Sequence, residues 1–231
     1  MKKAVVLLSA GMDSSVNLFQ AVTECDVVLT LTFDYGQKAA IKEIESAQKL
    51  AKYLKLAHKV IDLKWFKDFN RSSLLTSEQV PIGARVSIDD LQVSKESAKS
   101  VWVPNRNGIF LNIAAGFAES LSADYVIPGF NAEEAATFPD NSEAYMKALD
   151  HSFSFSTSNQ IQVKCYTSHL QKNAIVELGE KLNVPWHLVW PCYFAKERWC
   201  GQCESCQRAK RAFLNGGVDI DQLFLDESYH L

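Results

Sequence analysis

The chain has 231 residues, which suits one large α/β domain, alone or with a small appendix. Its 24 basic and 27 acidic residues give a net charge of −3, so we expect no nucleic-acid partner held by overall charge. The first apolar run ends at Ser9, and no later run approaches the ~18 apolar residues of a membrane helix. We therefore expect a soluble, cytoplasmic protein without a membrane partner. In that compartment six cysteines point to metal or chemistry before disulfides.

The N-terminal stretch predicts a strand, a tight turn and a helix. Residues 4–8 are apolar, residues 9–15 read Ser-Ala-Gly-Met-Asp-Ser-Ser, and spaced apolar residues follow. At such a junction the backbone N–H groups and the helix dipole favour an anion, and small side chains let phosphate oxygens approach closely. A plain β–α turn with a serine cap explains the same residues, so this stretch alone leaves both interpretations open.

Two further strands are predicted before residue 64. Residues 26–33 and 58–63 read as strands, and an amphipathic helix over 37–56 lies between them. Ligand crevices in parallel sheets lie at the carboxyl ends of strands. The polar residues that follow the first of these strands are therefore site candidates, although a simple turn would account for them too: Asp34, Tyr35 and Gln37.

Residues 64–100 lose periodicity and are rich in polar residues, over a span too long for an ordinary βα connection. We interpret this span as an irregular insertion that covers the site. After it, the sequence Val-Pro-Asn-Arg-Asn at 103–107 delivers Arg106 to the start of a helix that runs to Ser122. An arginine there can hold a phosphate through two hydrogen bonds, or it can form a surface salt bridge.

The fourth and fifth strands are predicted at 124–129 and 160–166. Carboxylates follow the fourth strand, at Glu133 and Glu134. They could bind magnesium or the polar edge of a substrate, or they could be ordinary charged residues of a loop. A helix that begins at Lys172 follows the fifth strand, and a cation is unfavourable at that end of a helix. An anionic ligand near Lys172 would offset the cost.

This alternation predicts an α/β fold with a doubly wound, parallel, five-stranded sheet. We assign residues 1–185 to this domain, including the insertion at 64–100, and residues 186–231 to a small C-terminal metal-binding segment. The segment has four cysteines, spaced C-x7-C-x2-C-x2-C: Cys192, Cys200, Cys203 and Cys206. Four thiolates at this spacing are typical of a closed, structural zinc site, and an iron–sulfur cluster is the rival for the same ligands.

Several motifs occur in a fixed order along nearly the whole chain: residues 9–14, 33–37, 103–107 and 138–140, then Lys172 and the four cysteines. Together they resemble the 7-cyano-7-deazaguanine synthases of queuosine biosynthesis. That family belongs to the PP-loop, or N-type, ATP pyrophosphatases, whose fold is adenine-nucleotide alpha hydrolase-like. The resemblance implies a homodimer with ATP as substrate, magnesium and one structural zinc ion per chain. It implies conversion of 7-carboxy-7-deazaguanine and ammonia to the 7-cyano compound, through an acyl-adenylate and an amide.

The resemblance also implies roles for individual residues. Asp13, Arg106 and Lys172 would act in catalysis, by stabilising charge as pyrophosphate leaves. Trp102 and Phe138 would offer stacking surfaces for the deazapurine, or would pack in the core. The nucleotide, its phosphates and the metal would be bound by Ser9, Ala10, Gly11, Met12, Ser14, Ser15, Tyr35 and Gln37, with zinc on Cys192, Cys200, Cys203 and Cys206.

Two positions depart from the pattern usual in this family. Members usually have Gly where this chain has Ala10, and Cys-Arg where it has Asn141-Ser142. Alanine suits the loop only with a negative φ and with its methyl group away from phosphate. Three other interpretations therefore stay open: a paralogue that stops at the amide or adenylates another acid, a tRNA-thiolating PP-loop enzyme that uses Cys165, and a zinc-stapled nucleotide-binding module without catalysis.

Overall fold

The computed structural model of the protein describes residues 1–68, 72–76, 80–83, 86 and 99–224. Five parallel strands form one sheet in the order β3-β2-β1-β4-β5. The strands are β1 (Lys3–Leu7), β2 (Asp26–Asp34), β3 (His58–Asp62), β4 (Tyr125–Ile127) and β5 (Gln162–Val163). The predicted doubly wound sheet is confirmed. β5 is shorter than predicted because this edge strand pairs only with the short β4.

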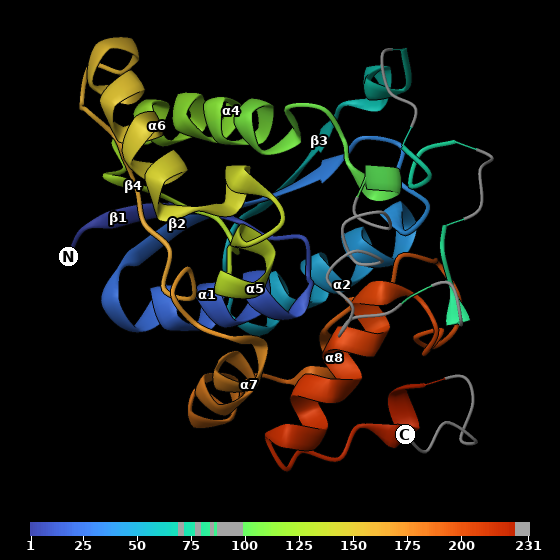
Figure 1. The fold of residues 1–231 in the computed structure, drawn as a ribbon. Coiled ribbons are helices and arrows are strands. Elements are labelled where there is room, and N and C mark those ends of the chain that lie inside the picture. Colours follow the sequence, from blue (N-terminus) through green and yellow to red (C-terminus); the bar gives the residue numbers. More distant parts are fainter. Residues whose placement is uncertain (69–71, 77–79, 84–85, 87–98, 225–231) are drawn as a thin grey trace.

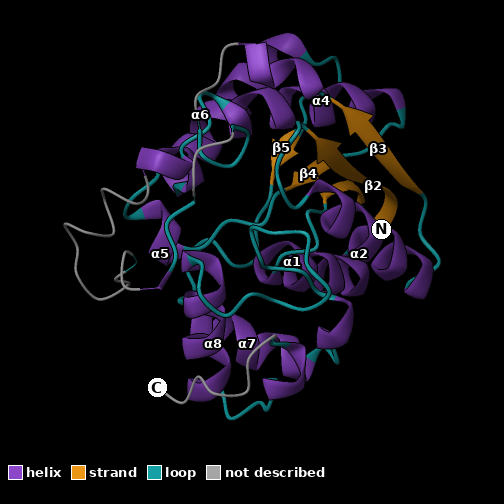
Figure 2. Ribbon diagram, turned by 90° about the vertical axis from the view of Figure 1, so that its right-hand side faces the viewer, coloured by secondary structure: helices purple, strands orange, loops and turns teal. Residues whose placement is uncertain are grey.

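Helices cover both faces of the sheet (Figures 1 and 2). On one face lie α4 (Arg106–Ser120) and α6 (Glu143–Ser156), and on the other lie α1 (Met12–Glu24) and α2 (Ala40–Tyr53). Strand β1 explains this arrangement, because Ala4 and Val6 are buried in one apolar core and Val5 in the other. Side chains alternate across a strand, so a strand that is apolar at successive positions needs helices on both faces.

The remaining helices are short or belong to the C-terminal part of the chain. Among the described residues they include α5 (Ala132–Ala135), α7 (Lys172–Lys181), α8 (Glu204–Asn215) and the 3₁₀ turns η1 (Lys64–Asp68), η3 (Pro139–Asn141), η4 (Trp186–Leu188) and η5 (Asp221–Leu223). None of the helices in the described ranges is long and apolar enough to cross a membrane. Much of the predicted insertion at 64–100 lies outside the described residues.

One apolar core joins the C-terminal segment to the sheet domain. Trp186, Trp199 and Phe213 share this core with Val16 of α1 and Ile175 of α7. The ring of Trp186 meets Phe213 edge-on at a centroid distance of 4.8 Å. The C-terminal segment therefore packs directly against the helices that follow β1 and β5, and the division at residue 185 stays a prediction.

The strand order fixes where a ligand crevice can form. From β1 the chain passes to β2 and β3 on one side, and then returns to β4 and β5 on the other side. The segments that leave β1 and β4 consequently diverge at the carboxyl edge of the sheet. A doubly wound sheet binds ligands in the crevice at this switch point.

Candidate active site

A cleft of about 260 Å³ opens at this switch point. Its wall is built from the segments after β1, β2 and β4 and from the starts of α4, α7 and α8. The cleft brings together most of the residues predicted to bind nucleotide or to act in catalysis: Ser9, Gly11, Met12, Asp13, Ser14, Tyr35, Gln37, Arg106 and Lys172. Ala10 and Ser15 are not among its lining residues.

The loop after β1 is shaped to receive an anion. Gly11 is the N-cap of α1, and over the described ranges no side chain caps this end of the helix. Ser9 Oγ accepts a hydrogen bond from Gly11 N at 3.3 Å and lies 3.1 Å from Ser14 Oγ. Gly129, after β4, approaches so closely that a Cβ there would lie 2.5 Å from Ser14 N. The first turn of α1 thus keeps its N–H groups available for a negatively charged ligand.

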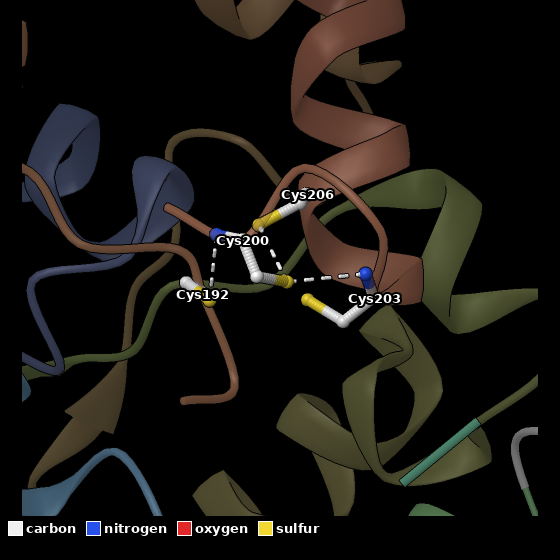
Figure 3. A group of neighbouring side chains, drawn as sticks. All are labelled: Cys192, Cys200, Cys203 and Cys206. Carbon is white, nitrogen blue, oxygen red and sulfur yellow. Dashed lines mark hydrogen bonds between the residues drawn. The ribbon is translucent and has the colours of Figure 1, made fainter. Parts of the chain in front are cut away.

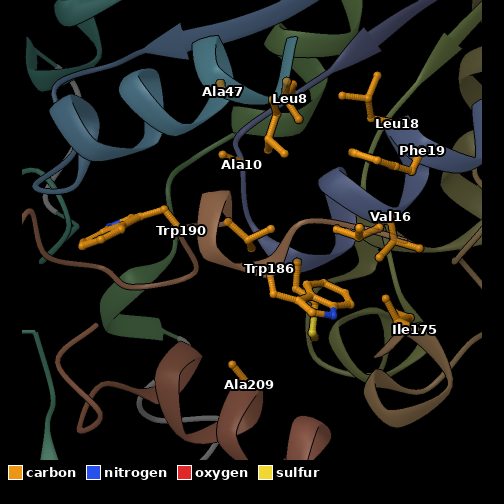
Figure 4. Close-up of a cluster of buried hydrophobic side chains, with 14 of the residues drawn as sticks. Leu8, Ala10, Val16, Leu18, Phe19, Ala47, Ile175, Trp186, Trp190 and Ala209 are labelled. Carbon is orange, nitrogen blue, oxygen red and sulfur yellow. The ribbon is translucent and has the colours of Figure 1, made fainter. Parts of the chain in front are cut away.

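Ala10 does not meet the first of the two conditions set for an alanine in this loop, because its φ is positive, at 61°. Its methyl group is fully buried in the apolar cluster with Leu8, Val16 and Trp190 (Figure 4), and so does not line the cleft. Its carbonyl accepts a hydrogen bond from Trp190 N at 2.7 Å. The left-handed backbone costs an alanine roughly 1–2 kcal/mol, and burial of the methyl group, worth about 0.8 kcal/mol, offsets part of that cost. Ser15 is also fully buried.

Lys172 lies between two carboxylates at the base of the cleft. Its side chain is 8% exposed, and its Nζ donates to Asp13 Oδ2 at 2.7 Å and to Glu134 Oε1 at 2.8 Å. Burial lowers the pKa of Lys172, but the charges of Asp13 and Glu134 outweigh burial and raise it above its ordinary value. The anion expected near Lys172 is therefore supplied, at least in part, by the protein itself.

The two carboxylates around Lys172 differ in their electrostatic surroundings. Burial raises the pKa of Asp13, with Lys172 opposing and Glu134 adding to the rise. Burial also raises the pKa of Glu134, but Lys172 and the side-chain amide of Asn131 outweigh burial, so the pKa of Glu134 is lowered. Asp13 Oδ1 is buried without a hydrogen-bond partner among the described residues. An unpaired carboxylate oxygen beside an anion-binding loop fits a divalent cation that also holds phosphate oxygens.

The loop after β2 is held by Gln37. Its Oε1 accepts from Tyr35 N at 3.0 Å, and its Nε2 donates to Glu43 Oε2 at 2.7 Å. Arg106 Nη1 donates to Tyr35 Oη at 3.4 Å, so the start of α4 meets this loop across the cleft. Asp34, the other candidate here, is paired with Lys64 at 3.2 Å and does not line the cleft.

Glu43 is a cleft residue that the sequence did not reveal. It lines the cleft from α2, and burial, opposed by the Gln37 hydrogen bond, raises its pKa to about 7. In the sequence it occupies one of several charged positions of an amphipathic helix, where a solvated side chain is the ordinary expectation. Nothing local in the sequence distinguishes it from Glu45 on the same helix.

Helix α8 closes another side of the cleft. Arg208 lines it and donates to Glu204 Oε1 at 2.8 Å and to Glu133 Oε2 at 3.3 Å. Arg211 also reaches Glu133, at 3.0 Å, and Glu133 Oε1 accepts from the backbone N of Lys172 at 3.1 Å. Glu133 is thus no plain loop charge, because it ties α5 to both α7 and α8.

The four predicted metal ligands lie together at the start of α8 (Figure 3). All four are buried, and their Sγ atoms lie within 4.8 Å of one another: Cys192, Cys200, Cys203 and Cys206. Gly201, with a φ of 71°, makes the turn between the second and third cysteines. Tetrahedral coordination with metal–sulfur bonds of ~2.3 Å places sulfurs about 3.8 Å apart. The Sγ atoms of Cys200 and Cys206 are 3.9 Å apart, so the cluster fits a single tetrahedral ion.

The family described as "Queuosine biosynthesis protein QueC" matches residues 3–217, which is most of the chain. The chain belongs to the QueC family. It is 60% identical over 225 residues to the 7-cyano-7-deazaguanine synthase of Bdellovibrio bacteriovorus, covering 96% of this chain and 97% of that protein. It is 48% identical over 223 residues to the protein of the same name from Desulforamulus reducens, covering 96% and 98%. The family predicted from the motifs is confirmed.

Among solved structures, this QueC chain is similar to an NMN synthetase from Francisella tularensis. The TM-score is 0.47 and the identity 17%, over 95% of this chain and 78% of that chain.

This QueC chain has Asn141-Ser142 where members of the family usually have Cys-Arg, and local contacts show what these two residues do. Ser142 Oγ accepts from Tyr145 N at 3.2 Å, so this residue caps the start of α6 and does not line the cleft. Asn141 is buried, lines the cleft and donates from Nδ2 to Asp140 Oδ1 at 3.0 Å. The position therefore supports a carboxylate on the cleft wall.

Proposed function

We propose that this chain is a 7-cyano-7-deazaguanine synthase that converts 7-carboxy-7-deazaguanine and ammonia to the 7-cyano compound at the expense of ATP. Relatives that carry this name align with nearly the whole chain, at 60% and 48% identity. The observation that best supports this chemistry is the juxtaposition, in one cleft, of an uncapped helix start and the buried Lys172 with its two carboxylates. The first binds phosphate oxygens, and the second stabilises charge beside them.

The reaction requires two adenylations. The carboxylate of the substrate attacks the α-phosphorus of ATP, pyrophosphate leaves, and ammonia displaces AMP to give the amide. The amide oxygen then attacks a second ATP, and its loss as AMP, together with a proton, leaves the nitrile. Both rounds develop negative charge on the departing pyrophosphate, which suits the N–H groups of α1, Arg106 and Lys172. Loss of one such contact typically costs ~10²–10³ in rate.

Magnesium and zinc have separate places in this proposal. Asp13 would hold magnesium through Oδ1, which has no hydrogen-bond partner among the described residues, and the ion would neutralise charge on the phosphates. The four cysteines would hold one zinc ion, because four thiolates leave no open position for a reacting water. A set of sulfurs within 4.8 Å of one another suits one ion better than an iron–sulfur cluster. A cytoplasmic homodimer remains a proposal that rests on the resemblance alone.

The tRNA-thiolation alternative is not favoured by the surroundings of Cys165. Its Sγ donates to the Phe130 carbonyl oxygen and to Asn17 Oδ1, both at 3.5 Å. Burial raises the pKa of Cys165, which disfavours the thiolate that such chemistry needs. Turnover should therefore survive in Cys165→Ser.

Pyrophosphate release tests the proposal. Purified protein loaded with zinc and supplied with magnesium and ATP should release pyrophosphate only when 7-carboxy-7-deazaguanine is present. Arg106→Met should lower the rate ~10²–10³-fold, and Cys165→Ser should not. Absence of acid-dependent release from the wild-type protein would overturn the proposed function.

A further inference from the structure

Two aromatic rings on the wall of the cleft lie nearly parallel to each other. Trp102 precedes α4 and Phe138 precedes η3, and their ring centroids are 5.8 Å apart with an interplanar angle of 8°. Both line the cleft, and Trp102 is 36% exposed. A large aromatic side chain with that much accessible surface is not packed as a core residue. Its accessible surface can instead stack on a flat ligand.

A carboxylate close to Phe138 in the sequence lines the same cleft. It belongs to Asp140, two residues after Phe138. Its Oδ1 accepts from Asn141 Nδ2 at 3.0 Å, and because Asn141 is buried this bond fixes the carboxylate. Burial raises the pKa of Asp140 above its ordinary value, and the positive charge of Arg106 limits this rise by favouring the ionised form. Asp140 is therefore a positioned acceptor in the cleft that the two rings also line.

We propose that Trp102, Phe138 and Asp140, which we call the base clamp, bind the deazapurine ring of the acid substrate, with the Asp140 carboxylate accepting hydrogen bonds from ring N1–H and the 2-amino group. This inference rests on the proposed function, since that function supplies a guanine-type substrate. A guanine-type edge presents two neighbouring N–H donors, and a carboxylate has two oxygens that can accept both.

The base clamp would also keep two purine-like rings apart. The enzyme must place ATP and the deazaguanine in one cleft without exchanging them. Adenine has an acceptor at N1 and no 2-amino group, so Asp140 would face a lone pair there and would be left unsatisfied. Specificity of this kind combines an attraction to one ligand with a penalty against the other.

The geometry of the substrate is compatible with this orientation. The 7-carboxylate sits on the five-membered ring, whereas N1 and the 2-amino group lie on the far edge of the six-membered ring. With that far edge on Asp140, the two negative carboxylates stand at opposite ends of the bicycle. Repulsion between them is then smallest, and the reacting group is free to approach the α-phosphorus.

Steady-state kinetics of Asp140→Asn test the base clamp. This variant keeps the shape of Asp140 but removes its charge and replaces one acceptor by a donor. The KM for 7-carboxy-7-deazaguanine should rise roughly 10- to 100-fold, while the KM for ATP stays unchanged. Asp62→Asn is the matched control, because Asp62 is an exposed carboxylate that does not line the cleft. It should leave both KM values unchanged.

A substrate analogue without the 2-amino group gives a second test that needs no variant. The wild-type protein should bind this analogue more weakly than the natural acid, measured by quenching of tryptophan fluorescence without ATP. Asp140→Asn should bind the two compounds with similar affinity. Equal affinity of the wild-type protein for both compounds, or an unchanged KM for the acid in Asp140→Asn, would overturn the base clamp.

The failure of the base clamp is distinguishable from that of the proposed function. A wild-type protein that binds the acid and discriminates against the analogue, yet releases no pyrophosphate, would retain the clamp and refute the synthase. A wild-type protein that releases pyrophosphate with the acid, but binds the acid and the analogue with equal affinity, would support the synthase and refute the clamp. A rise in the KM for ATP alone would assign Asp140 to the nucleotide and would likewise overturn the clamp.

Discussion

Lys172 is the most buried of the charged side chains that line the cleft. Its replacement by methionine removes this positive charge. Methionine has nearly the length of lysine and is apolar, so the packing of the side chain is largely kept. The substitution leaves Asp13 and Glu134 next to each other without the Nζ that lies 2.7 and 2.8 Å from their oxygens. Asp13 Oδ1 already lacks a partner in the part of the chain that the structure describes, so Asp13 loses its one ion pair there.

The expected cost is large. Removal of one partner from a buried ion pair typically costs about 3–5 kcal/mol, because it leaves an uncompensated buried charge. The whole stability of a domain is of the order of 5–15 kcal/mol, so Lys172→Met should remove a fifth or more of it. The double variant Lys172→Met/Glu134→Gln should be more stable than Lys172→Met, because it removes one of the two facing anions.

The loss of folding stability in Lys172→Met should depend on pH, and the pKa values of the two carboxylates give the direction of that dependence. Without Lys172, burial and mutual repulsion raise the folded-state pKa values of Asp13 and Glu134 above those of the unfolded chain. Such groups favour folding at low pH and oppose it as the pH rises through the folded-state pKa, so the deficit should be smaller near pH 5 than near pH 7. Urea unfolding followed by tryptophan fluorescence measures it. A deficit below ~1 kcal/mol near pH 7, or one that does not vary with pH, would refute the reasoning.

Three further predictions follow from single residues. Burial raises the pKa of Glu43 to about 7, above its value in the unfolded chain, so the melting temperature of the wild-type protein should fall as pH rises through about 7. Glu43→Gln should lose this dependence of melting temperature on pH, and an equal dependence in both proteins would contradict the prediction. Ala10→Gly relieves a left-handed backbone but deletes a buried methyl group, so urea unfolding should show a change of less than ~1 kcal/mol, and a loss above ~2 kcal/mol would be inconsistent with this balance. Cys206→Ser should lose bound zinc and the protease resistance of α8, as measured by metal analysis and limited proteolysis, whereas Cys25→Ser should keep both; a Cys206→Ser protein that retains zinc would exclude this ligand set.

Features encoded by neighbouring residues were predictable from the sequence. The apolar run before Ser9 and the polar turn after it predict a strand and a helix, and these are β1 and α1 within a few residues. The cysteine spacing predicts a four-thiolate cluster, and the four Sγ atoms do converge. In both cases the relevant contacts are made by residues close in the chain, so local pattern is sufficient.

Partners far apart in the chain were not predictable in the same way. Lys172 was recognisable as a costly cation at a helix start, but its pairing with Asp13 joins residues at opposite ends of the domain. Glu133 looked like a loop charge because both of its arginines belong to α8. The spacing of Glu204 and Arg208, which suits an i,i+4 pair on a helix, was the one local signal that could have drawn attention to this wall of the cleft.

The conformation of Ala10 is another feature that the sequence did not predict. Whether an alanine fits the loop depends on the sign of φ and on where the methyl group points. In the folded chain the Ala10 carbonyl accepts a hydrogen bond from Trp190 N, and the Ala10 methyl group shares an apolar cluster with the Trp190 ring. A sequence read locally does not bring residues 10 and 190 together.

Mass spectrometry of the product tests the central claim most directly. The zinc-loaded protein is incubated with magnesium, ATP, 7-carboxy-7-deazaguanine and isotopically labelled ammonia, and the products are followed with time. We expect a transient amide and then a nitrile that carries the label, with pyrophosphate released in both steps. Accumulation of the labelled amide without nitrile would contradict this expectation and would favour the paralogue that stops at the amide.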